Sequence, residues 1–270
     1  MKETIILGSE KIYDKDYCQK NKKPFENLKK ILDKLKKIFS DLKINVLEPR
    51  KEITGPFCRT LWVRDLSINI DNKVYLMPGM INIDKNNRHP VEEVKSLPNE
   101  VAVNGILLSE NIVMDGGDII QENNTILVGQ GKRTNKSAIL WLRKEFPSKK
   151  IIGIEHNKLH LDNCLCILPN KRILYSRECI SKLPKYLEDN YEIICVEDFI
   201  GKSDSANLAS NILVYKDNLI VANIKKFSKL YKHLESLNYK IHLIPFYNLH
   251  TDNGGIRCLT QWYYVKNNIR

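Results

Sequence analysis

The sequence predicts a single α/β domain, residues 1–270, in which five copies of one small unit are arranged radially as in a propeller. A unit of strand, tight polar turn, second strand, helix and third strand recurs along the chain. The second turn residues, Asn72, Asn124, Asn170 and Asn218, are 52, 46 and 48 residues apart. No linker rich in Pro, Gly or Ser divides the chain. We therefore expect one array with a shared core and a mouth on its axis.

Four units begin with a predicted hairpin, indicated by short apolar segments on both sides of a polar turn. The turns are Asp71-Asn72, Asn123-Asn124, Pro169-Asn170 and Asp217-Asn218. The strands before them are 66–70, 112–120, 161–168 and 211–215, and the strands after them are 73–77, 125–129, 172–175 and 219–222. Apolar residues at helical spacing follow at 90–97, 136–146, 180–190 and 225–237, and the closing strands are 101–103, 151–154, 193–196 and 241–245.

The fifth unit joins both ends of the chain. It consists of a strand at 4–7, a Lys-rich helix at 25–42, a strand at 44–47 and a returning strand at 259–265. The helix carries apolar residues every three or four positions, which is typical of one face packed on a core. Residues 20–43 contain nine Lys and three acidic residues, more than half of the net charge of +11. The pattern favours lysines on a solvated outer face over a membrane or RNA contact, although it does not decide whether the helix has a partner.

Cysteine content and hydropathy indicate the compartment. Seven cysteines in irregular spacing argue against a disulfide framework and for a reducing compartment in which one thiol has a chemical role. The apolar runs are far shorter than a bilayer span, and the start of the chain lacks a signal-peptide core. We expect a cytoplasmic protein without a membrane or nucleic-acid partner.

Several common motifs are absent or incomplete. The run 129–134, Gly-Gln-Gly-Lys-Arg-Thr, begins like a dinucleotide-binding loop but ends in Thr. Gly201-Lys202-Ser203 lacks the upstream Gly of a phosphate loop, and no Gly-x-Ser-x-Gly is present. A zinc site remains an alternative, but the spacing of its ligands is poor: His160, Cys164, Cys166 and Cys179. We expect no metal and no other cofactor.

Two segments carry reactive side chains. Gly254 and Gly255 allow close approach of backbone to a ligand, and Cys258 follows at the edge of a strand, next to Arg257, whose charge favours a thiolate. In a strand with period two, His160 and Asp162 lie on the same face and form an acid-base pair.

Further carboxylates occupy equivalent places in two other repeats. Asp65 and Asp115 stand near the hairpin start in two earlier repeats, at places equivalent to that of His160, so the radial array brings all of them to one mouth. A carboxylate accepts two parallel N–H bonds from a guanidinium, and the set therefore points to a planar cation as the substrate. Turn capping is the alternative role for these aspartates.

These residues resemble the guanidino-group-modifying enzymes of the pentein fold, a five-bladed α/β propeller. This superfamily includes arginine deiminases, agmatine deiminases, dimethylarginine dimethylaminohydrolases and amidinotransferases. The resemblance covers nearly the whole chain, in five segments in order. They are Trp62-Val63-Arg64-Asp65, Met114-Asp115-Gly116-Gly117-Asp118, the run 129–135, His160-Leu161-Asp162 and Gly254-Gly255-Ile256-Arg257-Cys258.

The resemblance implies a role for each residue. Cys258 is the nucleophile that forms a covalent thiouronium adduct, and His160 is the general acid and base. Asp65, Asp115 and Asp162 grip the guanidinium, whereas Asp118 braces the Gly-Gly turn.

The resemblance also bears on the substrate. It implies that Arg133, or else Arg88, binds a substrate carboxylate, with a solvated surface position as the alternative for both. The methylarginine hydrolases typically carry no acid where Asp162 stands. An N-methyl group would leave such a carboxylate with an unpaired acceptor, at a cost of about 1–3 kcal/mol. Substrates with unmethylated nitrogens, such as arginine, are therefore favoured.

The leading hypothesis is a cofactor-free hydrolase of the arginine deiminase type that converts arginine or a close analogue to citrulline and ammonia. The first alternative is an arginine amidinotransferase, in which an amine replaces the water. Dimethylarginine dimethylaminohydrolase and agmatine deiminase activities are further alternatives. A ribosome- or RNA-binding protein of the same fold is the non-enzyme alternative, which the net charge of +11 would suit. The sequence does not predict the oligomeric state.

Overall fold

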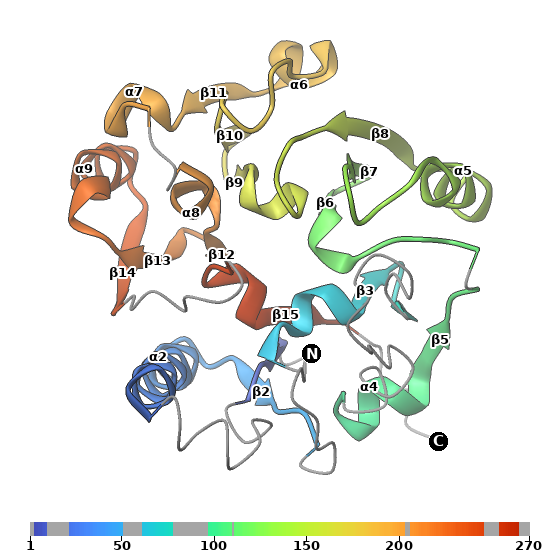
Figure 1. Ribbon diagram of the computed structural model, residues 1–270, viewed down its shortest axis with the longest axis horizontal. Helices are drawn as coiled ribbons and strands as arrows, with labels where there is room; N and C mark the ends of the chain where they lie inside the picture. Colours follow the sequence, from blue (N-terminus) through green and yellow to red (C-terminus); the bar gives the residue numbers. More distant parts are fainter. Residues whose placement is uncertain are drawn as a thin grey trace. The chain divides into compact units, whose positions relative to one another are not determined.

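The computed structural model describes residues 3–9, 22–50, 61–77, 97–109, 111–202, 206–245 and 254–264 (Figure 1). The chain forms two compact units. The first comprises 1–110, 247–253 and 258–270, and the second comprises 111–246 and 254–257. The single domain of residues 1–270 stays a prediction, as does closure of a propeller.

The first unit contains two three-stranded sheets. One has the order β15–β1–β2, with β1 Thr4–Leu7, β2 Asn45–Leu47 and β15 Thr260–Tyr263. The other has the order β3–β4–β5, with β3 Ser67–Ile70, β4 Lys73–Leu76 and β5 Gly105–Leu107. Strand β1 pairs antiparallel with β15, with Thr4 opposite Tyr263. The prediction that both ends of the chain complete one unit is therefore confirmed.

The second unit contains three further sheets of the same size. The first is β6–β7–β8, with β6 Ile119–Glu122, β7 Thr125–Gln130 and β8 Lys150–Glu155. The second is β9–β10–β11, with β9 Leu165–Leu168, β10 Arg172–Tyr175 and β11 Glu192–Cys195. The third is β12–β13–β14, with β12 Leu213–Tyr215, β13 Asn218–Asn223 and β14 Lys240–Pro245.

All five sheets share one connection, as the repeat predicts. The central strand pairs antiparallel with one neighbour and parallel with the other, and a segment containing a helix precedes the parallel strand. Positive φ at Asp71 and Asn72 (50° and 64°) fits the type of two-residue turn that matches strand twist. The last turn lies one residue earlier than predicted, at Lys216 and Asp217, because Asn218 already pairs in β13.

The Lys-rich helix is α2, Lys22–Asp41 (blue in Figure 1). Its apolar stripe is buried, including Leu28, Ile31, Leu35 and Phe39, whereas Lys29, Lys30, Lys34 and Lys37 are exposed. The interpretation of a solvated basic face on a packed helix is therefore confirmed. Among the residues that the structure describes, no helix has the length and apolarity of a membrane span.

The other helices in the described part of the chain are short. They are α4 Asn99–Asn104, α5 Lys136–Glu145, α6 Lys185–Asn190, α7 Glu197–Ile200, α8 Ala206–Ser210 and α9 Ser228–Ser236. The side chain of Asn135 caps α5 by accepting a hydrogen bond from the Ala138 backbone N–H at 3.2 Å. Helix α9 packs its buried Leu230 and Leu234 into a core shared with β10 and β13.

Two predicted boundaries were wrong. The predicted strand 101–103 lies inside α4, because Pro98 starts a helix there and Gly105 begins β5 instead. The predicted helix 180–190 begins only at Lys185, since Pro184 disfavours helical backbone in the residue before it. Most of the predicted helix 90–97 lies outside the described residues.

In every sheet a short helical turn precedes the strand that pairs antiparallel with the central strand. These turns are η3 Val63–Leu66, η4 Gly116–Asp118, η5 Leu161–Asn163, α8 Ala206–Ser210 and η7 Arg257–Leu259. The predicted strands 66–70, 112–120, 161–168 and 259–265 extend into this region. The turns interrupt the ladder because their backbone N–H groups bond locally, as the Cys164 N–H does to the Leu161 carbonyl at 2.8 Å.

Candidate active site

The predicted catalytic side chains occupy the same place in their repeats, at the helical turn before the first strand. Asp65 lies in η3, Asp115 directly before η4, His160 directly before η5, Asp162 in η5 and Cys258 in η7. Each of these five residues is buried, with 8% exposure or less. Asp65 and Cys258 belong to the first unit, and the other three belong to the second. The repeat therefore explains why chemically distinct residues recur at one structural position.

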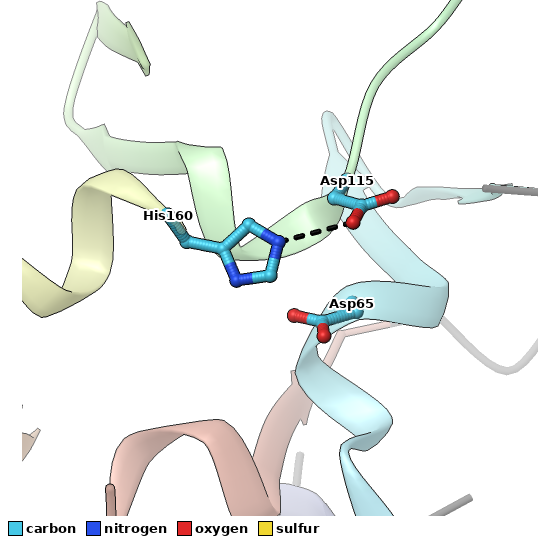
Figure 2. Close-up of side chains that lie close together, drawn as sticks. All are labelled: Asp65, Asp115 and His160. Atoms are coloured by element: carbon cyan, nitrogen blue, oxygen red, sulfur yellow. Dashed lines mark hydrogen bonds and ion pairs between the residues drawn. The ribbon is translucent and has the colours of Figure 1, made fainter. Parts of the chain in front are cut away.

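The second unit brings His160 and Asp115 into direct contact. The imidazole Nε2 lies 3.0 Å from Asp115 Oδ2, as Figure 2 shows, and the two side chains are 2% and 1% exposed. A buried carboxylate in this position fixes the orientation of the ring and stabilises its protonated form. The contact was not predicted, because Asp115 was assigned to the guanidinium.

Asp118 holds the backbone next to both members of this pair. Its Oδ1 accepts a hydrogen bond from the Leu161 backbone N–H at 2.7 Å, directly after His160. Its Oδ2 accepts the Thr134 hydroxyl at 2.6 Å, and Thr134 in turn accepts the Asp115 backbone N–H at 3.3 Å. Asp118 thus links the backbones of both members of the pair, which agrees with its predicted bracing role.

The glycines of the run 129–134 have a local packing role. The His156 ring lies against them, with Nε2 3.1 Å from Asp118 Oδ1. A Cβ built on Gly129 would lie 2.7 Å from His156 Nε2, and one built on Gly131 would lie 2.7 Å from its Cε1. Only glycine leaves room for a buried imidazole on Asp118 at these positions.

The predicted strand geometry of His160 and Asp162 is wrong. Residues 161–163 form the helical turn η5, so the alternation of a strand does not apply to them. Local hydrogen bonds explain the turn: the Asn163 N–H bonds to the His160 carbonyl at 3.3 Å, and Asp118 holds the Leu161 N–H.

In the first unit, hydrogen bonds join the turn that carries Asp65 to the strand that follows Cys258. The Arg64 guanidinium donates to Gln261 Oε1 in β15 at 2.9 Å, and the Gln261 amide donates to the Ser67 carbonyl. Asp65 and Cys258 therefore lie on adjoining elements of one unit.

The three arginines have different surroundings. Arg133 is 6% exposed, so the alternative of a solvated surface arginine is wrong for it. Arg257 is partly buried, and its backbone N–H donates to Asn211 Oδ1 at 2.8 Å. Arg88 lies outside the described residues.

The four residues considered as zinc ligands do not gather in one place. Cys164 and Cys179 share one core cluster and Cys166 belongs to another. A hydrogen bond with Cys164 lowers the pKa of the Cys179 thiol to about 7, and the same bond raises the pKa of Cys164. The Cys164 thiol also donates to the His160 carbonyl at 3.4 Å, so this thiol lies against the backbone of His160.

Sequence reasoning missed the supporting residues. His156, Asn163 and Asn211 are polar residues in unremarkable sequence contexts, and only the fold shows that they join separate segments. Thr134 was noted only as the residue that breaks a nucleotide motif, although its hydroxyl links Asp115 to Asp118.

No family model matches the sequence. The uncharacterized protein YkgA of Bacillus subtilis (strain 168) is 26% identical over 150 residues, which cover 54% of this chain and 51% of YkgA. The match therefore spans about half of that curated relative.

Solved structures match over nearly the whole chain. SxtG, an amidinotransferase of the saxitoxin biosynthetic pathway of Microseira wollei, superposes with a TM-score of 0.76 and 18% identity, covering 99% of this chain and 96% of SxtG. The N-terminal domain of ArgZ, a cyanobacterial arginine dihydrolase, gives 0.75 and 18%, covering 98% of both chains. In full-length ArgZ the match covers 39%.

DDAH from Pseudomonas aeruginosa gives a TM-score of 0.69 and 15% identity, covering 97% of this chain and 99% of DDAH. The chain therefore has the pentein fold that its motifs resemble, with five small three-stranded sheets.

Proposed function

We propose that this protein is a guanidino-modifying enzyme that hydrolyses the guanidinium group of arginine or a close analogue. The observation that carries the proposal is the buried contact of His160 with Asp115 on a fold shared with an amidinotransferase, an arginine dihydrolase and DDAH. The motif that ends in Cys258 supplies the nucleophile. The chemistry requires these side chains to meet around one substrate, as the five-bladed arrangement predicts.

The reaction has two halves. The Cys258 thiolate attacks the guanidinium carbon, and the C–N bond to one terminal nitrogen breaks as that nitrogen leaves as ammonia with a proton from His160. The product of this half is a cationic thiouronium. Water then attacks the same carbon while His160 takes one of its protons, and the C–S bond breaks to release the thiolate. The second proton of the water passes to solvent, where ammonia takes it up as ammonium, and the neutral ureido product leaves.

We assign the proton transfers to Nδ1 of His160, because Nε2 contacts Asp115. The Asp115 carboxylate keeps the ring in one orientation and offsets the charge that the ring gains on taking up a proton. Asp115 thereby acts on the imidazole in our proposal, in place of the guanidinium contact that the sequence suggested.

The buried carboxylates favour a planar cation. Asp65 and Asp162 are 8% and 1% exposed, and a carboxylate can accept two parallel N–H bonds from a guanidinium. Arg133 is buried in the second unit and is our candidate for a substrate carboxylate. These assignments favour arginine over agmatine, which lacks a carboxylate.

The proposal is tested by incubating the purified protein with isotope-labelled arginine, agmatine, methylarginine and guanidinoacetate and identifying the products. We expect citrulline and ammonia in equal amounts from arginine, with less product from the other three. Ornithine and two ammonia per arginine would indicate hydrolysis of the dihydrolase type. Absence of turnover of all four would contradict the proposal.

Amidino transfer is the second candidate, favoured by the match to SxtG along 99% of this chain. In this reaction the C–N bond to the substituted nitrogen breaks in the first half, so that ornithine, in place of ammonia, leaves with a proton from His160. An amine, in place of water, then attacks the thiouronium. Adding glycine or another primary amine to the same assay separates the two reactions. Ornithine formed only when the amine is present would establish transfer.

A further inference from the structure

Asn211 occupies a distinctive position in the repeat. It directly follows α8, the helix before β12. In the other four repeats a helical turn holds this place, and those turns carry or adjoin Asp65, Asp115, His160 and Cys258. Asn211 is 1% exposed, and nothing in its sequence context marks it as functional. Its surroundings therefore indicate what this fifth turn contributes.

The Asn211 amide joins two segments that are far apart in sequence. Its Oδ1 accepts the backbone N–H of Arg257 at 2.8 Å, one residue before Cys258. Its Nδ2 donates to Asn163 Oδ1 at 2.8 Å and to the Asp162 carbonyl at 3.4 Å, in the turn after His160. Both halves of one buried amide are used, one on each segment.

Gly255 lies close against the Asn211 side chain. A Cβ on Gly255 would overlap Asn211 Oδ1 and lie 2.8 Å from its Cβ. The glycine thus allows the chain to approach the amide closely, which gives a physical reason for a glycine two residues before Arg257.

We propose that Asn211 is a positioning residue that holds the segment carrying Cys258 against the turn that follows His160. The inference rests on the proposed function, in which Cys258 is the nucleophile and His160 the acid and base. The amide does not touch the reacting atoms in this scheme. It sets the distance between two segments that must cooperate, and small errors in such distances are costly to catalysis.

The test compares Asn211→Ala with Ser210→Ala. Ser210 is the matched control, because its buried hydroxyl donates to the Asn163 carbonyl at 2.8 Å, whereas the acceptor of the Arg257 N–H is Asn211. We expect Asn211→Ala to lower kcat by about 10²-fold with KM changed by no more than about threefold. Ser210→Ala should keep kcat within about threefold of the wild type.

Two further variants address the mechanism. Asn211→Asp keeps an acceptor for the Arg257 N–H, and we expect it to recover at least about tenfold of the kcat lost in Asn211→Ala. Gly255→Ala should lower kcat in the wild type but cost little more in Asn211→Ala, because the side chain that it overlaps is then absent. Equal losses of kcat in Ser210→Ala and Asn211→Ala, or additive losses for Gly255→Ala, would overturn the proposal.

Amide hydrogen exchange gives a readout that needs no substrate. A peptide covering 254–258 should lose protection at Arg257 in Asn211→Ala and keep it in Asn211→Asp and Ser210→Ala. If the wild type turns over no guanidino compound, the proposed function fails, and the exchange result still decides whether Asn211 holds this segment. Unchanged protection in folded Asn211→Ala would overturn the inference. Should Asn211→Ala not fold, exchange in Gly255→Ala is the corresponding test.

Discussion

The imidazole Nε2 of His160 lies 3.0 Å from Oδ2 of Asp115, and both side chains are almost fully buried. A buried hydrogen-bonded pair is held in one geometry only when the surrounding backbone is fixed. Here the backbone N–H of Asp115 bonds to Thr134, and that of Leu161 bonds to Asp118. The pair is therefore built on a rigid frame, which is what general acid-base catalysis requires.

The first prediction concerns Asp115→Asn. The amide removes the negative charge that stabilises a protonated His160, and we expect kcat to fall by about 10²–10⁴-fold, the usual contribution of general acid-base catalysis. Steady-state kinetics with arginine measure the effect. Asp189→Asn, which removes an exposed carboxylate from α6, is the control and should leave kcat unchanged. A folded Asp115→Asn protein with the kcat of the wild type would contradict the assigned role.

The second prediction concerns Cys258→Ser. A hydroxyl is a far weaker nucleophile than a thiolate, so kcat should fall by at least about 10³-fold. Arginine should still bind, which an increase in Tm on adding arginine would show. Cys195→Ser, at a buried thiol at the end of β11, is the control and should retain turnover. Retained activity in Cys258→Ser would exclude this residue as the nucleophile.

Much of the fold was predictable because its signals are local. Apolar segments flanking polar turns indicated the hairpins, and the spacing of the turns indicated the repeat. The short helical turns were not predictable in the same way. Leu161 to Asn163 reads as part of a strand. It forms a turn in which local backbone bonds are joined by a long-range bond from the Leu161 N–H to Asp118, 43 residues earlier. Such long-range bonds override local propensity.

The sequence singles out the candidate site residues but not their geometry. Cys258, His160 and the aspartates stand out because glycines and a family resemblance surround them. Asn211 has neither signal, although its amide bonds to two distant segments. The partner of Asp115 was missed for the same reason, since 45 residues separate it from His160 and only the packed unit brings them together.

The third prediction concerns the stability of the frame. The Asp118 carboxylate accepts hydrogen bonds from Leu161, His156 and Thr134. In Asp118→Asn one of its two oxygens becomes an NH2 group, which faces one of these donors and cannot accept its hydrogen bond. We expect a loss of about 1–3 kcal/mol in the free energy of unfolding. Thermal denaturation should show a fall in Tm of about 2–4 °C for each kcal/mol.

Thr134→Val is the matched comparison, because it removes one of these bonds with little change of shape and also removes the acceptor of the Asp115 backbone N–H. It should cost about 1–3 kcal/mol. The double variant should lose less than the two single losses added together, since both changes affect one hydrogen bond. Strict additivity would show that the Thr134 hydroxyl does not act through Asp118.

The fourth prediction concerns Glu197 in the second unit, whose side chain is 6% exposed. Burial alone raises the pKa of this carboxyl, but hydrogen bonds outweigh it, and the net pKa is below its usual value of 4.5. Oε1 accepts the Ser176 hydroxyl at 2.5 Å, and Oε2 accepts the Cys195 thiol at 2.9 Å and the Arg177 backbone N–H at 3.1 Å. These donors favour the ionised form in the folded protein.

A carboxyl whose pKa is lower in the folded than in the unfolded state stabilises the fold above the unfolded value, and this contribution is lost as the pH falls through the folded value. Glu197→Gln should therefore lower the free energy of unfolding at pH 7 by about 1–3 kcal/mol, with the difference from wild type shrinking below about pH 4.5. Urea denaturation across this pH range measures it. Asp198→Asn breaks an exposed ion pair with Arg177 and should cost less than about 1 kcal/mol at pH 7. A difference between wild type and Glu197→Gln that stays constant down to pH 3 would contradict the ionised state assigned to Glu197, because only its loss of charge links the difference to pH.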